Sequence, residues 1–331
     1  MHESLTARTR IFTPIALTIG VLSLSSAAIL FRASEAPEVP TVFYRVAFSA
    51  LLLLPLAARS GELTGALRRP IVWLAGVALA LHFWSWMTSL RMTSVASSTL
   101  FVTTTPVWIA IAARWIPGER PLNRVGWTGM SVALLGGVAL IAGASGYWPT
   151  LQNAEGPAAV TYEGARYVTP AATLGVTFGG IAMATLGAWL AAIYLTCGRI
   201  GRQTLGLASF ACGANLVAAL VLLAVAAVRG DPFYGWPAST WLVLVALAAL
   251  PQLLGHNSLL WAVKTVGATI VALVVLTEPV GATALAWFIF QERPETFELV
   301  GGLFLLLGLA LAIAGHRRAP TNQEAGDPPL A

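Results

Sequence analysis

Residues 267–294 read GATIVALVVLTEPVGATALAWFIFQERP, and a similar stretch occurs earlier in the chain. Residues 94–121 read SVASSTLFVTTTPVWIAIAARWIPGERP, and a constant offset of 173 aligns Thr104-Thr105-Pro106 with Thr277-Glu278-Pro279. Ten of the 28 aligned pairs are identical. Chance in a sequence of this composition would give about 2 to 4 identities. The sequence therefore predicts a chain built from a duplicated unit.

Composition predicts an all-α integral membrane protein. Apolar residues make up 57% of the chain and charged residues 10%, against about 25% charged residues in soluble domains, and the mean hydropathy is +0.77. The net charge is +5, but the basic residues lie between apolar runs, which favours a role in membrane topology over nucleic-acid binding. Cys197 and Cys212 lack metal-ligand spacing and are expected to be buried small side chains.

Apolar runs of about 20 residues, the length that crosses a hydrocarbon layer, predict ten transmembrane helices. They lie near residues 12–31, 41–58, 71–90, 94–115, 126–143, 173–196, 205–228, 239–262, 266–290 and 297–315. The first run follows Arg8 and Arg10 as in a signal peptide. We assign it as a membrane helix because it exceeds the usual apolar region of about 7 to 15 residues.

The distribution of basic residues predicts that both termini are cytoplasmic. With that orientation, thirteen of the 19 basic residues fall on the inside and five on the outside, while Arg45 lies in the second helix. Each repeat has five helices, an odd number, so the two repeats are predicted to be inverted. The expected divisions are a first repeat at 1–143, an external linker at 144–172, a second repeat at 173–315 and a cytoplasmic tail at 316–331.

Inverted repeats commonly bind solute near the bilayer midplane, at interrupted helices. Pro106 and Pro279 are predicted to lie at that depth. Each proline lacks a backbone donor, so the carbonyls of Val102 and Val275 are expected to be available to a cavity, to water or to a neighbouring side chain. The alternative is a tolerated kink with no function.

Two charged side chains lie deep inside predicted spans, whereas Arg114 and Glu298 lie at span ends. Glu278 is the one acid deep within a span, where a carboxylate costs about 2.5 kcal/mol or more. Either it exchanges a proton and couples transport, or it is a neutral, hydrogen-bonded structural group. Arg45 either contributes to the site or extends its charge to the nearer membrane surface.

His82 and His256 come within one residue of matching under the offset of 173, and we expect both to line a cavity. The candidate solute-binding residues are His82, Trp84, Thr104, Pro106, His256, Asn257, Thr277 and Pro279. The weaker candidates are Arg45, Trp189 and Tyr194. No carboxylate or cysteine lies at helical spacing from either histidine, so no metal site is predicted, and no cofactor is indicated.

Small residues recur at intervals of four in the fifth and tenth predicted helices. They are Gly129, Ala133 and Gly137 in the fifth and Gly308 and Ala312 in the tenth. Small side chains let helices approach closely. The contact could lie within the monomer or across a homodimer.

The arrangement of ten helices in two halves, each with a proline followed thirteen residues later by a glutamate, resembles the EamA-type transporters of the drug/metabolite transporter superfamily. The pairs here are Pro106 with Glu119 and Pro279 with Glu292, and Arg45-Val46-Ala47-Phe48 also looks like that family's second helix. The resemblance implies a bacterial inner-membrane carrier, often an exporter of metabolites or amino acids, that works by alternating access.

Two other classes of function compete with a carrier. A channel or scaffold would account for ten helices but not for an inverted duplication with a polar midplane. A membrane enzyme would need paired catalytic groups at one depth, and the one midplane carboxylate has no acidic partner. The expected partners are therefore a small-molecule solute and the lipid bilayer.

Overall fold

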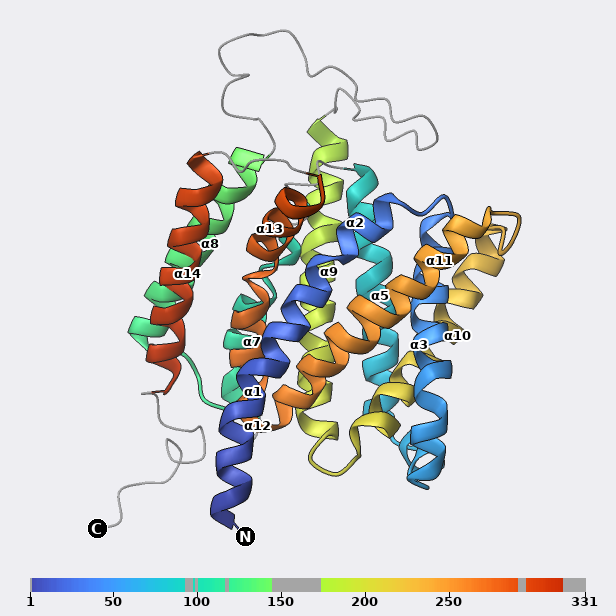
Figure 1. Ribbon diagram of the computed structural model, residues 1–331, viewed down its shortest axis with the longest axis horizontal. Helices are drawn as coiled ribbons and strands as arrows, with labels where there is room; N and C mark the ends of the chain where they lie inside the picture. Colours follow the sequence, from blue (N-terminus) through green and yellow to red (C-terminus); the bar gives the residue numbers. More distant parts are fainter. Residues whose placement is uncertain are drawn as a thin grey trace, which may run out of the picture. The chain divides into compact units, whose positions relative to one another are not determined.

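The structure is a computed structural model that describes residues 2–92, 98, 101–116, 119–144, 174–290 and 296–317. Every regular element in these ranges is a helix, which confirms the predicted all-α class for the described residues (Figure 1). The elements are α1 His2–Ser25, α2 Ala27–Arg32, α3 Glu38–Arg59, α4 Leu63–Leu67, α5 Pro70–Met92, α7 Thr105–Ala112, the 3-10 turn η1 Ala113–Trp115, α8 Arg124–Ala144, α9 Leu174–Gly201, α10 Leu207–Arg229, α11 Ala238–Leu247, the π-helix η3 Ala248–His256, α12 Asn257–Val275, α13 Glu278–Phe290 and α14 Thr296–Arg317. The predicted linker at 144–172 lies outside the described residues except for Ala144, and the predicted tail at 316–331 lies outside them except for His316 and Arg317.

Seven helical windows among the described residues are long and apolar enough to cross a membrane. They are Phe12–Phe31, Glu38–Arg59, Pro70–Ser89, Phe178–Gly201, Leu207–Arg229, Ala238–Val275 and Leu299–His316. The chain is thus a multi-pass membrane protein. The count of ten spans stays a prediction, because backbone breaks divide the runs predicted at 94–115 and 266–290 into shorter helices.

The longest window, Ala238–Val275, contains 38 residues and is broken at Gly267, where φ is 86° and ψ is 164°. The guanidinium of Arg199 closes the helix that precedes this break, since its Nη1 donates to the carbonyl of Lys264 at 2.6 Å. The last carbonyls of a helix lack intrahelical donors, and an arginine side chain can supply them. The break lies a few residues beyond the predicted boundary at 263–265, because glycine, not the polar residues before it, permits this backbone conformation.

The chain forms two compact units. Unit 1 comprises Met1–Trp84 and Leu190–Val271, and unit 2 comprises Ser85–Trp189 and Ala272–Ala331. Each unit therefore combines part of the first predicted repeat with part of the second. Cys197 and Cys212 are buried free thiols in unit 1, as expected.

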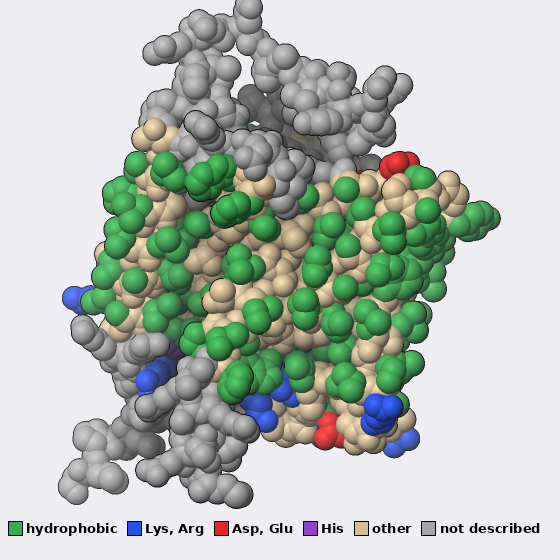
Figure 2. Space-filling model, in the orientation of Figure 1, with side chains coloured by type: hydrophobic (Ala, Val, Ile, Leu, Met, Phe, Trp, Pro, Cys, Tyr) green, Lys and Arg blue, Asp and Glu red, His purple; other side chains and the backbone are tan. Residues whose placement is uncertain are grey.

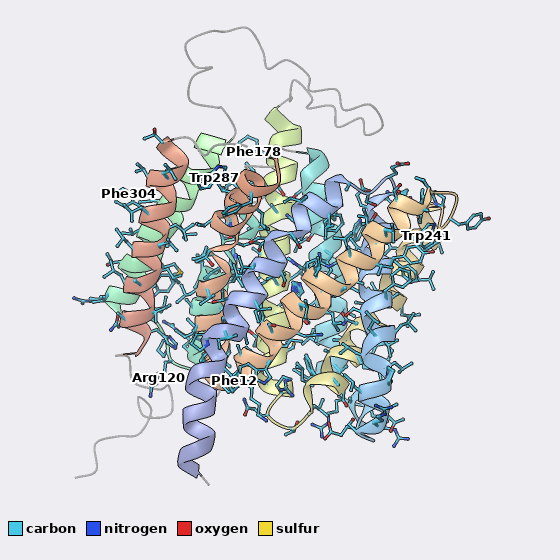
Figure 3. The ribbon with its side chains drawn as sticks, in the orientation of Figure 1. Phe12, Arg120, Phe178, Trp241, Trp287 and Phe304 are labelled. Atoms are coloured by element: carbon cyan, nitrogen blue, oxygen red, sulfur yellow. The ribbon has the colours of Figure 1, made fainter. Side chains whose placement is uncertain are left out.

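In unit 1, α3 packs along α10, and α1 packs against η3. Aromatic side chains gather near the beginning of α3, where Tyr44 lies 5.0 Å from the ring of Trp241 and its hydroxyl donates to the carbonyl of Phe233 at 2.7 Å (Trp241 in Figure 3). Clusters of tyrosine and tryptophan are typical of the membrane–water interface. This end of α3 therefore corresponds to one membrane surface, and Arg59 at its other end to the opposite surface.

In unit 2, α8 and α14 run side by side (Figure 1). A Cβ atom on Gly129 would lie 2.3 Å from the backbone nitrogen of Ala312, and one on Gly308 would lie 2.2 Å from that of Ala133. The small residues thus serve close packing within the monomer. Outward-facing side chains of α14 include Phe304, which is 51% exposed (Figure 3).

The prediction that Gly137 takes part in this close approach was wrong. A Cβ atom on Gly136 would lie 2.3 Å from the backbone nitrogen of Leu305, whereas one on Gly137 would lie 3.7 Å from the nearest atom, a methyl group of Leu305. An α-helix has 3.6 residues per turn, so two turns after Gly129 the same face is reached at seven residues and not at eight. The close approach therefore involves Gly136.

Candidate functional site

Two helix breaks in unit 2 occupy the same register of the sequence repeat. α7 begins at Thr105 and α13 begins at Glu278, which are separated by the repeat offset of 173. Each is preceded by a turn, at 103–104 and at 276–277. The two copies of the repeat predicted from sequence therefore have the same local backbone structure at these positions.

The threonine before each break closes the preceding turn in the same way. The Thr104 hydroxyl donates to the carbonyl of Phe101 at 2.6 Å, and the Thr277 hydroxyl donates to the carbonyl of Val274 at 2.7 Å. Both bonds reach back three residues. A threonine hydroxyl that takes over a carbonyl in this way competes with continuation of the helix, so it contributes to the break.

The two prolines do not lie midway along a continuous helix. Pro106 and Pro279 are each the second residue of a new helix, where the missing N–H would have no intrahelical acceptor. The Val102 carbonyl accepts a hydrogen bond from a neighbouring side chain, one of the predicted alternatives, since the Thr105 hydroxyl donates to it at 2.9 Å. The same hydroxyl also lies 3.3 Å from the carbonyl of Ala188.

Glu278 is the first residue of α13 and is half-buried. The N-terminus of a helix carries a partial positive charge, which stabilises a nearby carboxylate by about 0.3–1 kcal/mol at exposed sites. Its counterpart in the first repeat is the uncharged Thr105. The two breaks thus share a geometry and differ by one ionisable group.

The remaining candidate in unit 2 is Trp189 on α9. Its side chain is 52% exposed, and the preceding residue, Ala188, is the one whose carbonyl lies 3.3 Å from the Thr105 hydroxyl.

In unit 1, Arg45 belongs to a buried polar network. Its side chain is 1% exposed, and its Nε donates to Oε1 of Gln252 at 2.9 Å. The Gln252 amide donates to Oδ1 of Asn215 at 3.0 Å, and the Asn215 amide donates to the hydroxyl of Ser49 at 3.4 Å. Arg45 therefore does not extend to a membrane surface, and the network joins α3, α10 and η3.

Aromatic rings bring Arg45 and His256 into one cluster. The guanidinium carbon of Arg45 lies 4.1 Å from the centre of the Phe83 ring, a cation–π contact. His256 stacks on Phe83 at 5.4 Å with an interplanar angle of 2°, and His82 lies 5.0 Å from the same ring. Tyr194 lies 6.1 Å from His256. Four of the candidates in unit 1 thus meet around Phe83.

His256 ends the π-helical segment η3. Pro251 lies inside this segment and removes one backbone donor, which favours the wider turn. Both ring nitrogens of His256 are buried without a hydrogen-bond partner in the described part of the chain. Asn257, the next residue, is 7% exposed, and Trp84 is half-buried on α5. Short π-helical segments are frequent at functional sites.

Sequence reasoning missed three residues of this cluster. Asn215 is the one side-chain amide in the apolar run 207–229, and that isolation is a signal that could have identified it. Gln252 lies four residues before His256 in the predicted helix 239–262, but nothing in the sequence indicates that it pairs with Arg45. Phe83 gives no signal in the sequence, because a phenylalanine in an apolar helix is usually a packing residue.

Comparison with known proteins identifies the chain's relatives. A family model described as "EamA-like transporter family" matches twice, over residues 12–142 and 178–314. No curated protein matches the chain. A solved structure titled "Crystal structure of protein" has 18% sequence identity and a TM-score of 0.72, and the match covers 92% of this chain and 98% of the other. At that identity, the match demonstrates a shared fold alone.

The two matched ranges account for most of the chain, and each contains one of the two breaks at equivalent register. The repeated motif, the apolar helices and the matched ranges lead to one conclusion: the chain belongs to the EamA-like transporter family.

Proposed function

We propose that the protein is a secondary carrier that moves a small organic solute across the membrane by alternating access. The observation that supports this most directly is the pair of matched breaks at Thr104-Thr105-Pro106 and Thr277-Glu278-Pro279. Each break supplies backbone polar groups and a new helix N-terminus within an otherwise apolar run. Interrupted helices with these properties commonly hold the solute in transporters built from repeats.

The proposed solute is a small metabolite such as an amino acid or an amphiphilic compound, moved in the direction of export across a bacterial inner membrane. The breaks in unit 2 are one candidate place for this solute. The cluster around Phe83 in unit 1 is a second candidate, because it combines aromatic rings with a few polar groups, as many small-molecule sites do.

Counterflow in proteoliposomes tests whether the protein is a carrier. We expect saturable uptake of a labelled amino acid or other metabolite that accelerates when unlabelled solute is loaded inside. Thr104→Val and Thr277→Val each remove one hydroxyl at a break, and we expect each to lower uptake about fivefold, since a hydrogen bond contributes about 1 kcal/mol.

Thr128→Val is the matched control, because the Thr128 hydroxyl donates at 3.0 Å to a carbonyl within α8, away from either break. We expect it to transport as the wild type does. Flux that never saturates, for any solute tested, would instead identify a channel.

We further propose that Glu278 exchanges a proton during transport. Its neutral form would be favoured while the site is dry, and the N-terminus of α13 would favour the carboxylate once water enters. Glu278→Gln is expected to lose uptake driven by a pH gradient and to retain exchange at equal pH. Glu38→Gln, at the first residue of α3, is the control and should keep its response to the gradient. A Glu278→Gln variant that also keeps the wild-type response would make this residue structural.

The proposed orientation has both termini in the cytoplasm. After the buried Cys197 and Cys212 are replaced, a cysteine at the exposed Thr64 in α4 should be shielded from an impermeant thiol reagent in intact cells. A cysteine at Ser239, near the beginning of α11, should react. The reverse labelling pattern would invert the orientation.

A further inference from the structure

Three connecting segments of unit 1 are bound to one another at the end of α3 that carries Arg59. The segment 59–69 contacts the segment 198–206, because Oε2 of Glu62 accepts a hydrogen bond from the Gly206 backbone at 2.8 Å and Arg69 donates to the Thr204 hydroxyl. Close to these contacts, Ser60 and Ser209 share a hydrogen bond of 2.8 Å. The two segments thus form one ordered surface.

The third segment, 260–264, is bound by two inward-facing arginines. Arg202 is 7% exposed and donates to the carbonyls of Leu205 at 2.6 Å and Leu260 at 3.4 Å. Arg199 donates to the carbonyl of Lys264. Burial, the larger effect, lowers the pKa of Arg202, and the charge of the exposed Glu62 raises it.

The outer side of this surface is strongly basic. The three segments contain six basic residues and one acidic residue, Glu62. Four basic side chains are exposed, and we call them the basic end of unit 1: Arg59, Arg68, Arg69 and Lys264. Figure 2 shows Lys and Arg side chains at the lower edge of the apolar surface, where the lower end of α3 lies in Figure 1.

Apolar side chains adjoin the basic end directly. Trp73 is 46% exposed, and its Nε1 donates to the carbonyl of Leu67 at 2.8 Å, so its ring faces the apolar zone while its polar edge meets the connecting segment. Leu56 and Leu74 are 56% and 51% exposed. Tryptophan in this arrangement marks the depth of lipid headgroups. The exposed arginines therefore lie at headgroup depth beside a surface suited to acyl chains.

From this arrangement we propose that the basic end of unit 1 is a binding site for anionic glycerophospholipids. The Arg59, Arg68 and Arg69 guanidinium groups hold the lipid phosphate, since arginine presents paired donors that match phosphate oxygens. The acyl chains lie along Leu56 and Leu74. A soluble anion would use the charges but gain nothing from the apolar side chains, so the combination favours a lipid.

The test uses the purified full-length protein in detergent, titrated with phosphatidylglycerol, phosphatidylcholine or inorganic phosphate, with thermal unfolding and native mass spectrometry as readouts. We expect phosphatidylglycerol to bind and to raise the unfolding temperature, and neither of the other two to do so. Arg68→Gln/Arg69→Gln should shift the phosphatidylglycerol midpoint about 25-fold, from about fivefold for each charge near a membrane surface.

Two control variants test whether the effect comes from the charges of the basic end itself. One removes only a hydrogen bond, and the other removes a charge elsewhere. Thr204→Val removes the bond to Arg69 but keeps every charge, and Arg229→Gln removes an exposed charge at the opposite end of α10. Both should bind phosphatidylglycerol as the wild type does. If the double variant does not fold, Arg59→Gln tests the same surface and should shift the midpoint about fivefold.

Three outcomes would overturn the proposal. They are equal binding of phosphatidylglycerol and phosphatidylcholine, equal protection by inorganic phosphate at the same concentration, and an unchanged midpoint in both Arg68→Gln/Arg69→Gln and Arg59→Gln. Equal protection by phosphate would identify a site for soluble anions. The measurement involves no transport, so its result is independent of the proposed carrier.

Discussion

Gly136→Ala is expected to abolish most of the folded protein, whereas Gly137→Ala, one residue further along the same helix, should fold as the wild type does. An alanine Cβ at 136 would lie 2.3 Å from the backbone nitrogen of Leu305, but one at 137 would lie 3.7 Å from the nearest atom. A methyl group placed in a closed contact must separate α8 from α14, and overpacking of this kind costs about 1–3 kcal/mol or more. The yield of monodisperse protein and its thermal unfolding measure the difference.

The atom nearest to a methyl group added at position 136 is the backbone nitrogen of Leu305, so a second substitution can test this contact. Trimming the opposing side chain with Leu305→Ala should not rescue Gly136→Ala, because the clash is with the nitrogen and not with the side chain. Rescue by Leu305→Ala, or equal yields of the two alanine variants, would mean that α8 and α14 are not this close.

The equivalence of the two breaks was predictable from sequence, because the two copies of the repeat can be aligned with each other. The offset of 173 paired Thr104 with Thr277 and Pro106 with Pro279, and both helices restart at the expected register. The hydrogen bonds at the breaks were not predictable. Which partner the Val102 carbonyl takes depends on the rotamer of Thr105, and that rotamer is selected by tertiary packing.

The cluster in unit 1 was predictable residue by residue but not as a cluster. Arg45, His82 and His256 were noticeable because ionisable groups are costly inside a membrane span. Their partners were not, since hydropathy indicates that α3, α10 and η3 are buried but not which faces meet. The Gln252 bonds to Arg45 and to Asn215 join residues far apart in the sequence, and a single chain contains no signal for such pairings.

The backbone conformation of a glycine likewise cannot be predicted from the sequence. Gly267 has an unusual conformation. Its φ of 86° with ψ of 164° lies in a region that glycine alone occupies readily. Gly230, the residue after α10, has a φ of 70° and a ψ of 27°, in the left-handed region that asparagine also tolerates. Both residues have positive φ, so replacing each with asparagine separates the two cases.

Gly267→Asn is therefore expected to destabilise the protein strongly, whereas Gly230→Asn should be nearly neutral. Strain of this kind costs about 1–3 kcal/mol, so the ratio of folded to unfolded protein should fall about fivefold or more for Gly267→Asn. The loss should be larger still when Arg199→Gln is added, because Arg199 donates to the carbonyls of Val263 and Lys264 at the helix end that this glycine terminates. Thermal unfolding in detergent, compared at equal protein concentration, measures all three variants. Equal stability of the two asparagine variants would contradict the backbone turn at Gly267 and restore a single continuous helix from Ala238 to Val275.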